Sequence, residues 1–264
     1  MKIGFIGLGN MAKAIIGGLL NQSIVESEDL IGSSATKETA ASVHDMFHME
    51  TTLDNCKVAK EAGVLFLAVK PQFFPEVIAQ IKEHVSEDTL IISIAAGKSI
   101  SYIEEEFAHP IRLARAMPNT PALVSAGCTG VCFNERITEE QKELTLKLLR
   151  SFGMASEVPE RLMDTVGAVS GSSPAYVFML IEAMADAAVL GGMPRKQAYD
   201  FAAQAVLGSA KLVLESGKHP GELKDMVCSP AGTTIEGVRI LENNHFRGSV
   251  MEALKGCIDK SKKL

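Results

Sequence analysis

Cysteine, tryptophan and positive charge are all scarce in this sequence. Its 264 residues include five cysteines, no tryptophan, and 26 lysine and arginine residues against 32 aspartate and glutamate residues, for a net charge of -6. An odd number of cysteines without a CxxC pair does not predict a disulfide framework and is typical of reduced thiols in the cytosol. The negative net charge leaves no basic surface for a phosphate backbone, so we expect no nucleic acid partner.

Signals for secretion, membrane insertion and metal binding are also lacking. The amino-terminal stretch runs directly into a strand-like segment, without a basic region followed by a hydrophobic leader. The longest apolar helix candidate, residues 176–193, carries Glu182 and Asp186, which argues against a membrane span. His44 and His48 have the spacing of a helical metal pair, but without an HExxH pattern a solvated helix face is favoured. We therefore predict a soluble, cytoplasmic protein without a bound metal.

The first half of the chain alternates short apolar runs with helical patterns. This alternation is typical of βαβ units and a parallel sheet. Strands are expected at 2–6, 30–33, 51–53, 64–69, 90–95, 111–116 and 127–133, and helices at 10–20, 37–48 and 138–152. The last helix opens with a capping box from Thr138 to Gln141. We predict that residues 1–160 form an α/β Rossmann-like domain with a mostly parallel sheet.

The second half shows helical patterns alone. Helices are expected at 174–190, 194–216, 220–227, 233–243 and 247–262. Pro174 and Pro194 are interpreted as first-turn prolines that open the two long helices, and Gly217 as a C-terminal cap. We predict a separate all-α domain over residues 161–264. Small residues at 183–191 fit either a dimer interface or packing within one chain.

A glycine-rich turn joins the first strand to the first helix. Gly7, Gly9 and Ala12 match GxGxxA, a form of the dinucleotide-binding fingerprint, in the strand-turn-helix position that gives this motif its meaning. Gly7 allows the tight turn, and Gly9 removes the Cβ that would collide with a pyrophosphate. The N–H groups at the start of the helix would face the anion. We predict a dinucleotide site at this turn.

The residues after the second expected strand favour NADP(H) over NAD(H). An NAD-specific protein normally places an acidic residue here to hold the ribose 2′-hydroxyl, and none is present. The hydroxyls of Ser33, Ser34 and Thr36 and the cation of Lys37 could instead accept a 2′-phosphate. These residues could also cap the helix over 37–48, and the two interpretations are compatible.

Further candidate site residues lie at strand ends and in one turn of the helical half. Ligands of open α/β sheets bind beyond the carboxyl ends of the strands. The segments expected there are 68–71, 95–97 and 117–121. In the second half, residues 229–235 form a small-residue turn before a helix, whose N–H groups and hydroxyls could hold a carboxylate or simply cap the helix.

The motifs together resemble the pyrroline-5-carboxylate reductase family. They are GFIGLGNMA at 4–12, LFLAVKPQ at 65–72, SIAAG at 93–97, RAMPNTP at 115–121, AVSGSSPAY at 168–176, and HPGELKD to SPAGTTI over 219–235. They follow one another over nearly the whole chain. The resemblance implies reduction of L-1-pyrroline-5-carboxylate, a cyclic imino acid, to L-proline with NADPH or NADH as donor. It also implies a helical C-terminal domain that forms homodimers, often assembled into a ring of dimers.

The resemblance also implies roles for individual residues. The nucleotide contacts fall on Gly7, Gly9, Asn10, Met11, Ser34, Asn55, Ala68, Lys70, Pro71, Ala96 and Gly97. The substrate carboxylate contacts fall on Ser229, Gly232 and Thr233, and the catalytic donor to the ring nitrogen is Thr234. This chain departs from the family at Ser173 and Ala231, where the family usually has glycine. A side chain there would disturb a backbone with positive φ.

Two other functions remain open from the sequence. A β-hydroxyacid dehydrogenase shares the glycine-rich opening and the helical second domain, but its catalytic lysine has no counterpart in residues 172–182. A non-catalytic NADP-binding sensor could use the same fold, because a fold does not establish a chemistry. Retention of the 229–234 turn argues against the sensor.

Overall fold

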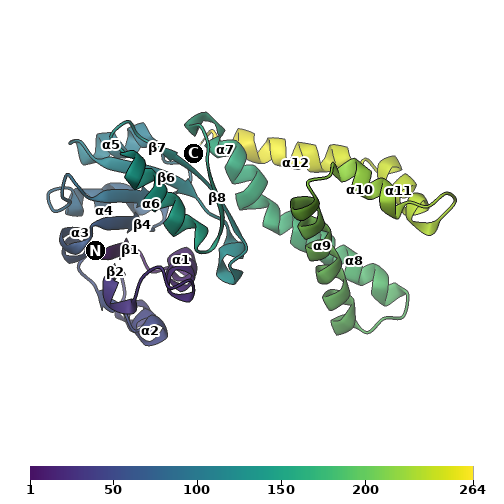
Figure 1. Cartoon of the computed structure of the whole chain (residues 1–264), viewed down its shortest axis with the longest axis horizontal. Helices are drawn as coiled ribbons and strands as arrows, with labels where there is room; N and C mark the ends of the chain where they lie inside the picture. Colours follow the sequence, from purple (N-terminus) through teal and green to yellow (C-terminus); the bar gives the residue numbers. More distant parts are fainter. Residues whose placement is uncertain (264) are drawn as a thin grey trace. The chain divides into compact units, whose positions relative to one another are not determined.

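The computed structural model describes residues 1–263 and divides into two compact units (Figure 1). The first unit comprises Met1–Ser172 and the end of the chain from Ile258, and the second comprises Ser173–Cys257. The first unit contains the sheet, and the second is helical. The predicted fold class, an α/β Rossmann-like part followed by an all-α part, is confirmed.

The first unit is built on one eight-stranded sheet in the order β3-β2-β1-β4-β5-β6-β7-β8. The strands are β1 (Ile3–Ile6), β2 (Leu30–Ser33), β3 (Glu50–Thr52), β4 (Val64–Leu67), β5 (Leu90–Ser93), β6 (Arg112–Met117), β7 (Gly127–Phe133) and β8 (Gly153–Glu157). All neighbouring strands pair in parallel except β6 and β7, which pair antiparallel. The carboxyl ends of β1 to β6 therefore meet at one edge, where the sequence places its candidate ligand residues.

Helices cover both faces of this sheet. They are α1 (Asn10–Asn21), α2 (Lys37–Phe47), α3 (Asn55–Glu61), α4 (Phe74–Ile81), α5 (Ile100–Phe107) and α6 (Glu139–Arg150). Because both faces are covered, β1, β4 and β5 are buried at every position and have the near-continuous apolar sequences typical of such strands.

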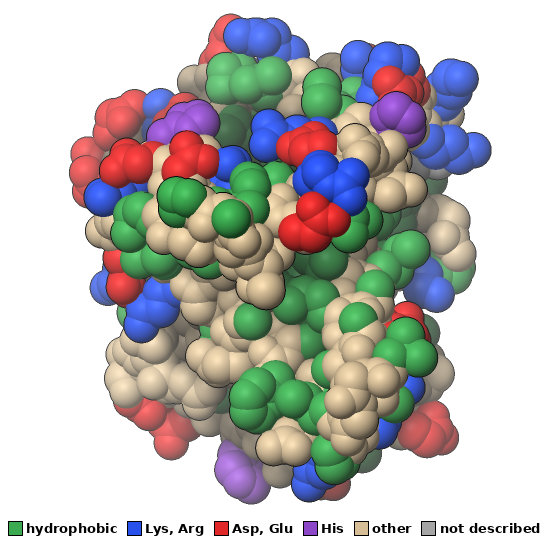
Figure 2. All heavy atoms as spheres, turned by 90° about the vertical axis from the view of Figure 1, so that its right-hand side faces the viewer, with side chains coloured by type: hydrophobic (Ala, Val, Ile, Leu, Met, Phe, Trp, Pro, Cys, Tyr) green, Lys and Arg blue, Asp and Glu red, His purple; other side chains and the backbone are tan. Residues whose placement is uncertain are grey.

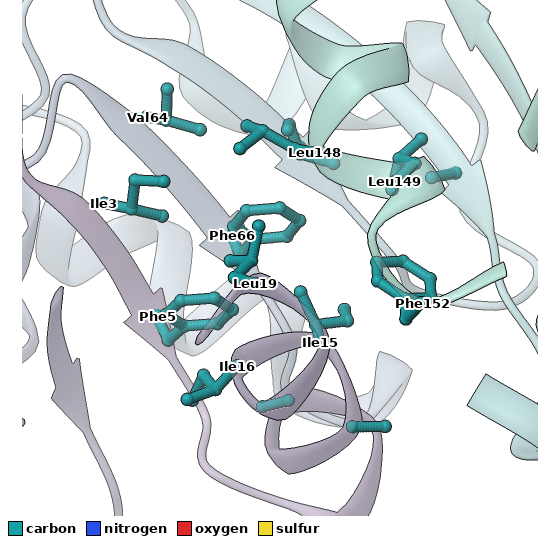
Figure 3. Packing of buried hydrophobic residues seen from close by; sticks show 14 of the residues in the cluster. Ile3, Phe5, Ile15, Ile16, Leu19, Val64, Phe66, Leu148, Leu149 and Phe152 are labelled. Carbon is teal, nitrogen blue, oxygen red and sulfur yellow. The ribbon is translucent and has the colours of Figure 1, made fainter. Parts of the chain in front are cut away.

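Aromatic stacking marks the core on the α1 and α6 side of the sheet (Figure 3). The rings of Phe5 and Phe66, from the adjacent strands β1 and β4, stack with centroids 4.8 Å apart. Ile15 and Leu19 of α1 belong to the same buried cluster. This packing fixes α1 on the sheet and so determines where its N-terminus lies.

A continuous helical stretch leads from the sheet into the second unit. It passes through the short turn η4 (Glu160–Leu162), α7 (Met163–Val166), a π-helical segment (Gly167–Ser172) and α8 (Ser173–Leu190). Pro174 thus lies inside a helix, and the prediction that it opens one is wrong. Proline displaces the carbonyl four residues earlier and offers it no N–H, and the wider π-helical turn just before it accommodates both effects.

The second unit consists of α8 (Ser173–Leu190), α9 (Arg195–Ser216), α10 (Pro220–Val227), α11 (Thr233–Asn243) and α12 (Phe246–Ser261), the last of which returns to the first unit. Pro194 is the N-cap of α9 rather than its first residue, and Gly217 caps its end at φ 64° as expected. The predicted spans of α10 and α11 match the structure.

Little of the second unit is buried. Its core is three alanines, Ala185, Ala198 and Ala202, lined by a few partly buried apolar residues. Large apolar side chains remain exposed in it, among them Phe178, Met179, Leu190, Phe201, Leu207 and Leu214. Figure 2 shows apolar side chains between charged ones on one face of the molecule. Exposed apolar surface on this scale is typical of a protein–protein interface.

Residues 160–190 are also long and apolar enough to cross a membrane. Within this 31-residue helical stretch, an 18-residue window has a mean hydropathy of 1.4, and 6% of that window is buried. The sequence argument against a span rested on Glu182 and Asp186, and two charges do not lower the hydropathy enough to remove the stretch from this class. Only its length and composition make it a possible membrane span, and the same length and composition also fit a helix that packs against another chain.

Candidate active site

The turn after β1 requires glycine at its first position. Gly7 has φ +96°, and a Cβ built on it would lie 2.7 Å from the carbonyl oxygen of Ala68. The Gly7 N–H donates to the carbonyl of Ser33 at 2.9 Å, and the Ala68 N–H donates to Ile6 at 2.8 Å. The backbones that follow β1, β2 and β4 thus meet at one point of the sheet edge.

The second glycine of the motif faces open space. Gly9 is the N-cap of α1, and a Cβ built on it would meet nothing within 4 Å. Within residues 1–263, no side chain caps the N–H groups of this turn and no acidic residue lies in it. Asn10 and Met11 form the first turn, and Ala12 is buried against the sheet. The arrangement offers unpartnered N–H groups and the positive end of a helix dipole to an anion.

The loop after β2 has two roles. Ser34 Oγ donates to the carbonyl of Thr36 at 2.8 Å, and Thr36 Oγ1 accepts from the Thr39 N–H, capping α2. Ser33 differs from its predicted role, because it is fully buried and its hydroxyl donates to Asn55 Oδ1 at 2.7 Å. The hydroxyl of Ser33 is therefore committed inside the protein rather than offered to a 2′-phosphate.

A cavity of about 380 Å³ opens beside this loop. Gly7, Ser34 and Asn55 contribute to its wall. Asn55 Nδ2 donates to Gln80 Oε1 of α4 at 2.8 Å, which fixes the orientation of the Asn55 amide. Gln80 also lines the cavity, and it could not be predicted from the sequence because its contact with Asn55 joins residues 25 positions apart.

The remaining cofactor candidates follow β4 and β5. Lys70 is exposed and precedes Pro71, the first residue of the 3-10 turn η2 (Pro71–Phe73). Ala96 is exposed, and Gly97 has φ +73°. Since β1, β4 and β5 are parallel neighbours, these segments lie along the same edge as Gly7. The structure therefore brings the eleven predicted nucleotide residues to one edge of one unit.

Glu160 holds the loop after β5 in place. Its Oε1 accepts from the backbone N–H of Ile100, at the start of α5, at 2.7 Å and from Arg115 Nη1 of β6 at 2.9 Å. Cys132 of β7 lies nearby, and burial, with the negative charge of Glu160, raises the pKa of its thiol to about 12. This thiol is therefore neutral at physiological pH and is not a candidate nucleophile.

The predicted substrate residues lie in the second unit, between α10 and α11. Ser229, Thr233 and Thr234 are exposed, and the two threonines begin α11. Gly232 is the N-cap, where a Cβ would lie 2.3 Å from Ser229 Oγ, and its N–H donates to the Ser229 carbonyl at 3.0 Å. The turn thus exposes hydroxyls at the N-terminus of a helix of 11 residues, an arrangement that suits a carboxylate.

The two departures from the family pattern have different outcomes. Ser173 is helical, so its side chain causes no backbone strain. Ala231 adopts φ +56°, the left-handed conformation that glycine tolerates at lower cost. Of the two positions, only Ala231 therefore has the positive φ at which a side chain disturbs the backbone.

We expect the substitution Ala231→Gly to stabilise the protein. The left-handed conformation costs alanine about 1–2 kcal/mol, and the greater freedom of glycine in the unfolded chain offsets about 0.4–1 kcal/mol of the gain. Urea denaturation should show a net gain of about 0.5–1 kcal/mol. The matched control is Ala205→Gly, at an exposed position inside α9, which should instead lose about 1 kcal/mol. A loss of stability in Ala231→Gly would contradict the inference that the backbone at Ala231 is strained.

Two family models match the chain. Residues 160–264 match the model described as pyrroline-5-carboxylate reductase dimerisation. Residues 2–97 match the model described as NADP oxidoreductase, coenzyme F420-dependent. The matches cover the helical part and the nucleotide-binding edge separately.

Full-length relatives are similar over both parts. The pyrroline-5-carboxylate reductase of Escherichia coli (strain K12) is 51% identical over 263 residues, which cover 100% of this chain and 98% of that protein. A solved pyrroline-5-carboxylate reductase from Coxiella burnetii has a TM-score of 0.93 at 34% identity, covering 99% of this chain and 97% of that one. The structure from Plasmodium falciparum, solved with NADP bound, has a TM-score of 0.90 at 33% identity, covering 100% and 97%.

Proposed function

The chain belongs to the pyrroline-5-carboxylate reductase family, and from this premise we propose how its own residues perform that activity. The reaction is the reduction of L-1-pyrroline-5-carboxylate to L-proline, the last step of proline biosynthesis, with NADP(H) as cofactor. The observation that supports it most strongly is 51% identity over the full chain to a reductase of that name. In domain terms, we assign nucleotide binding to residues 1–160, and substrate binding and dimerisation to residues 161–264.

The nucleotide-binding edge fits a dinucleotide. The space beside Gly9 is what a pyrophosphate needs for close approach to the N–H groups of α1. We assign the pyrophosphate to Gly9, Asn10 and Met11, and the ribose side to the cavity beside Ser34 and Asn55. The remaining contacts are assigned to Gly7, Ala68, Lys70, Pro71, Ala96 and Gly97. NADH is the alternative donor at the same edge.

When bound, the reduced nicotinamide supplies the hydride for the imine carbon. The protein then has to orient two ligands, exclude water and manage one proton. We assign the substrate carboxylate to Ser229, Gly232 and Thr233, where the positive end of α11 stabilises a negative charge. We assign to the hydroxyl of Thr234 a hydrogen bond donated to the ring nitrogen, which would orient the ring and make the imine carbon more electrophilic.

The exposed apolar helices support an assembled enzyme. The family model that matches residues 160–264 describes a dimerisation region, and the apolar stretch 160–190 lies within it. We assign this surface to the contact with a second copy of the chain rather than to a membrane. We further propose a ring of dimers and a cytoplasmic location, which suits a soluble substrate and five reduced cysteines.

An assay of the purified protein tests this function directly. Consumption of NADPH with L-1-pyrroline-5-carboxylate should be rapid, and it should exceed the rate with the six-membered cyclic imino acid and with β-hydroxyacids and NADP⁺. The assay should use material whose mass, from light scattering, corresponds to at least two chains. Binding of NADPH without turnover of any imine would instead favour a sensor.

A further inference from the structure

One buried amide connects the end of β6 to the helix that leads into the second unit. Asn119, which is 7% exposed, follows Pro118 just after β6. Its Oδ1 accepts from the backbone N–H of Cys128 at 2.8 Å, and its Nδ2 donates to the backbone carbonyl of Ser170 at 2.9 Å. Both functions of the amide are therefore used in contacts across the chain.

The bond to Cys128 continues the pairing of β6 with β7. These strands are antiparallel, with Met117 opposite Gly130, so the next residues along the same register place Asn119 opposite Cys128. Pro118 has no N–H with which to extend the ladder. The side chain of Asn119 accepts a hydrogen bond from β7 instead, and this bond holds the turn after β6 against β7.

The bond to Ser170 reaches the π-helical segment that precedes Pro174. Ser170 lies inside this segment, and its carbonyl accepts from Asn119 Nδ2, a donor that comes from outside the helix. The side chain of Met117 packs nearby, because Cβ atoms built on Gly167 and Gly171 would each lie 3.4 Å from its Cε. The turn after β6 and the π-helical segment therefore fit together closely.

We propose that Asn119 is a positioning residue of the reductase, and that its amide fixes the 117–121 turn to the π-helical segment. The proposal rests on the proposed function. β6 is a parallel neighbour of β5, so this turn lies at the same edge of the sheet as the nucleotide residues. A displacement of the turn would disturb the geometry of hydride transfer, in which small errors of position are costly.

The substitution Asn119→Asp separates the two bonds. An ionised carboxylate still accepts from the Cys128 N–H but cannot donate to the Ser170 carbonyl. At about pH 8 we expect kcat/KM to fall about ten- to a hundred-fold relative to wild type, the effect of a small misplacement, while the Kd for NADPH changes less than about threefold.

Lowering the pH should restore the variant. Burial and the nearby carbonyl raise the pKa of a carboxyl group at this position, and its protonated form carries an O–H that can donate to Ser170. The ratio of kcat/KM between Asn119→Asp and wild type should therefore rise as the pH falls from about 8 to about 6. Protonation of the imine substrate affects both proteins equally, so it cancels in the ratio of their kcat/KM values. If the variant does not fold while its introduced carboxyl group is ionised, the sample at low pH still supplies folded protein.

Asn134 offers a matched control. It is a buried asparagine at the opposite end of β6, where it accepts from the Leu113 N–H at 3.1 Å and donates to the Ile111 carbonyl at 2.8 Å. Asn134→Asp should lower the melting temperature without the pH-dependent loss of kcat/KM. Hydrogen exchange of the amides at 168–173 and 175 should accelerate in Asn119→Asp alone, and this readout does not depend on activity.

These measurements distinguish the possible failures. If the wild-type protein does not reduce the imine, the proposed function fails, while hydrogen exchange still reports on the contact with Ser170. If Asn119→Asp keeps wild-type kcat/KM, or shows a loss that is independent of pH and equal to that of Asn134→Asp, Asn119 is only a structural residue and the proposal is wrong.

Discussion

Replacing Thr234 by alanine is expected to lower kcat by about ten- to a thousand-fold, the usual scale for the loss of a general acid or a polarising contact. The hydroxyl is exposed at the start of α11, where it can reach a bound ligand. The helix itself should be unharmed, because alanine is the better helix former. Steady-state kinetics should place the loss mainly in kcat, with the Kd for NADPH unchanged, since the predicted cofactor residues lie on the other unit.

The matched control for this experiment is Thr234→Ser, which keeps the hydroxyl and loses a methyl group. It should retain most of the activity. If Thr234→Ala had wild-type kinetics, or if the serine variant lost as much activity as the alanine variant, the hydroxyl would have no part in the mechanism. A change in KM alone would mean that Thr234 helps to bind the ring without assisting the reaction.

Replacing Gly9 by alanine is expected to weaken NADPH binding with little effect on the fold. The added methyl group meets no protein atom within 4 Å, so it occupies the space assigned to the pyrophosphate. An overpacked contact of this kind costs about 1–3 kcal/mol, which corresponds to about a five- to 150-fold rise in Kd. Titration of the fluorescence of NADPH measures this change directly.

Gly17, in the same helix, provides the control. Its Cβ would make an ordinary contact, 3.7 Å from Phe47 Cε1, and alanine is favoured over glycine inside a helix. Gly17→Ala should therefore keep the wild-type affinity for NADPH with equal or greater stability. Equal affinities for NADPH in the Gly9 and Gly17 variants would show that the pyrophosphate does not bind at the α1 turn.

The parts of the site that depend on local rules could be predicted from the sequence. The positions of Gly7 and Gly9 follow from the contrast between a β-strand pattern and a helical pattern on either side of the turn, and the structure places both where the motif requires. The capping box of Thr138 and Gln141 is likewise a local interaction, and it is present. Such features need only neighbouring residues, so the sequence contains all the information about them.

Contacts between distant residues explain what the sequence did not predict. Ser33 was expected to face the ligand, and its hydroxyl bonds to Asn55 instead, 22 residues later. Pro174 was expected to start a helix, and it instead follows a π-helical segment within a longer helical stretch. The contact of that segment with Asn119, which is 51 residues from Ser170, is invisible to local rules. The short edge strand β8, with an exposed residue at most positions, lacks the alternation that would identify it.

The alanine core of the helical unit links the integrity of the enzyme to its concentration. Three alanines and Leu223 bury too little apolar surface to hold five helices together, so we expect much of the free energy of folding to come from burial against another subunit. A protein of this kind melts at a higher temperature when it is concentrated and loses structure on dilution, because dissociation and unfolding become the same event. The time for which the diluted enzyme stays active therefore depends on the dissociation of its subunits as much as on the stability of each chain.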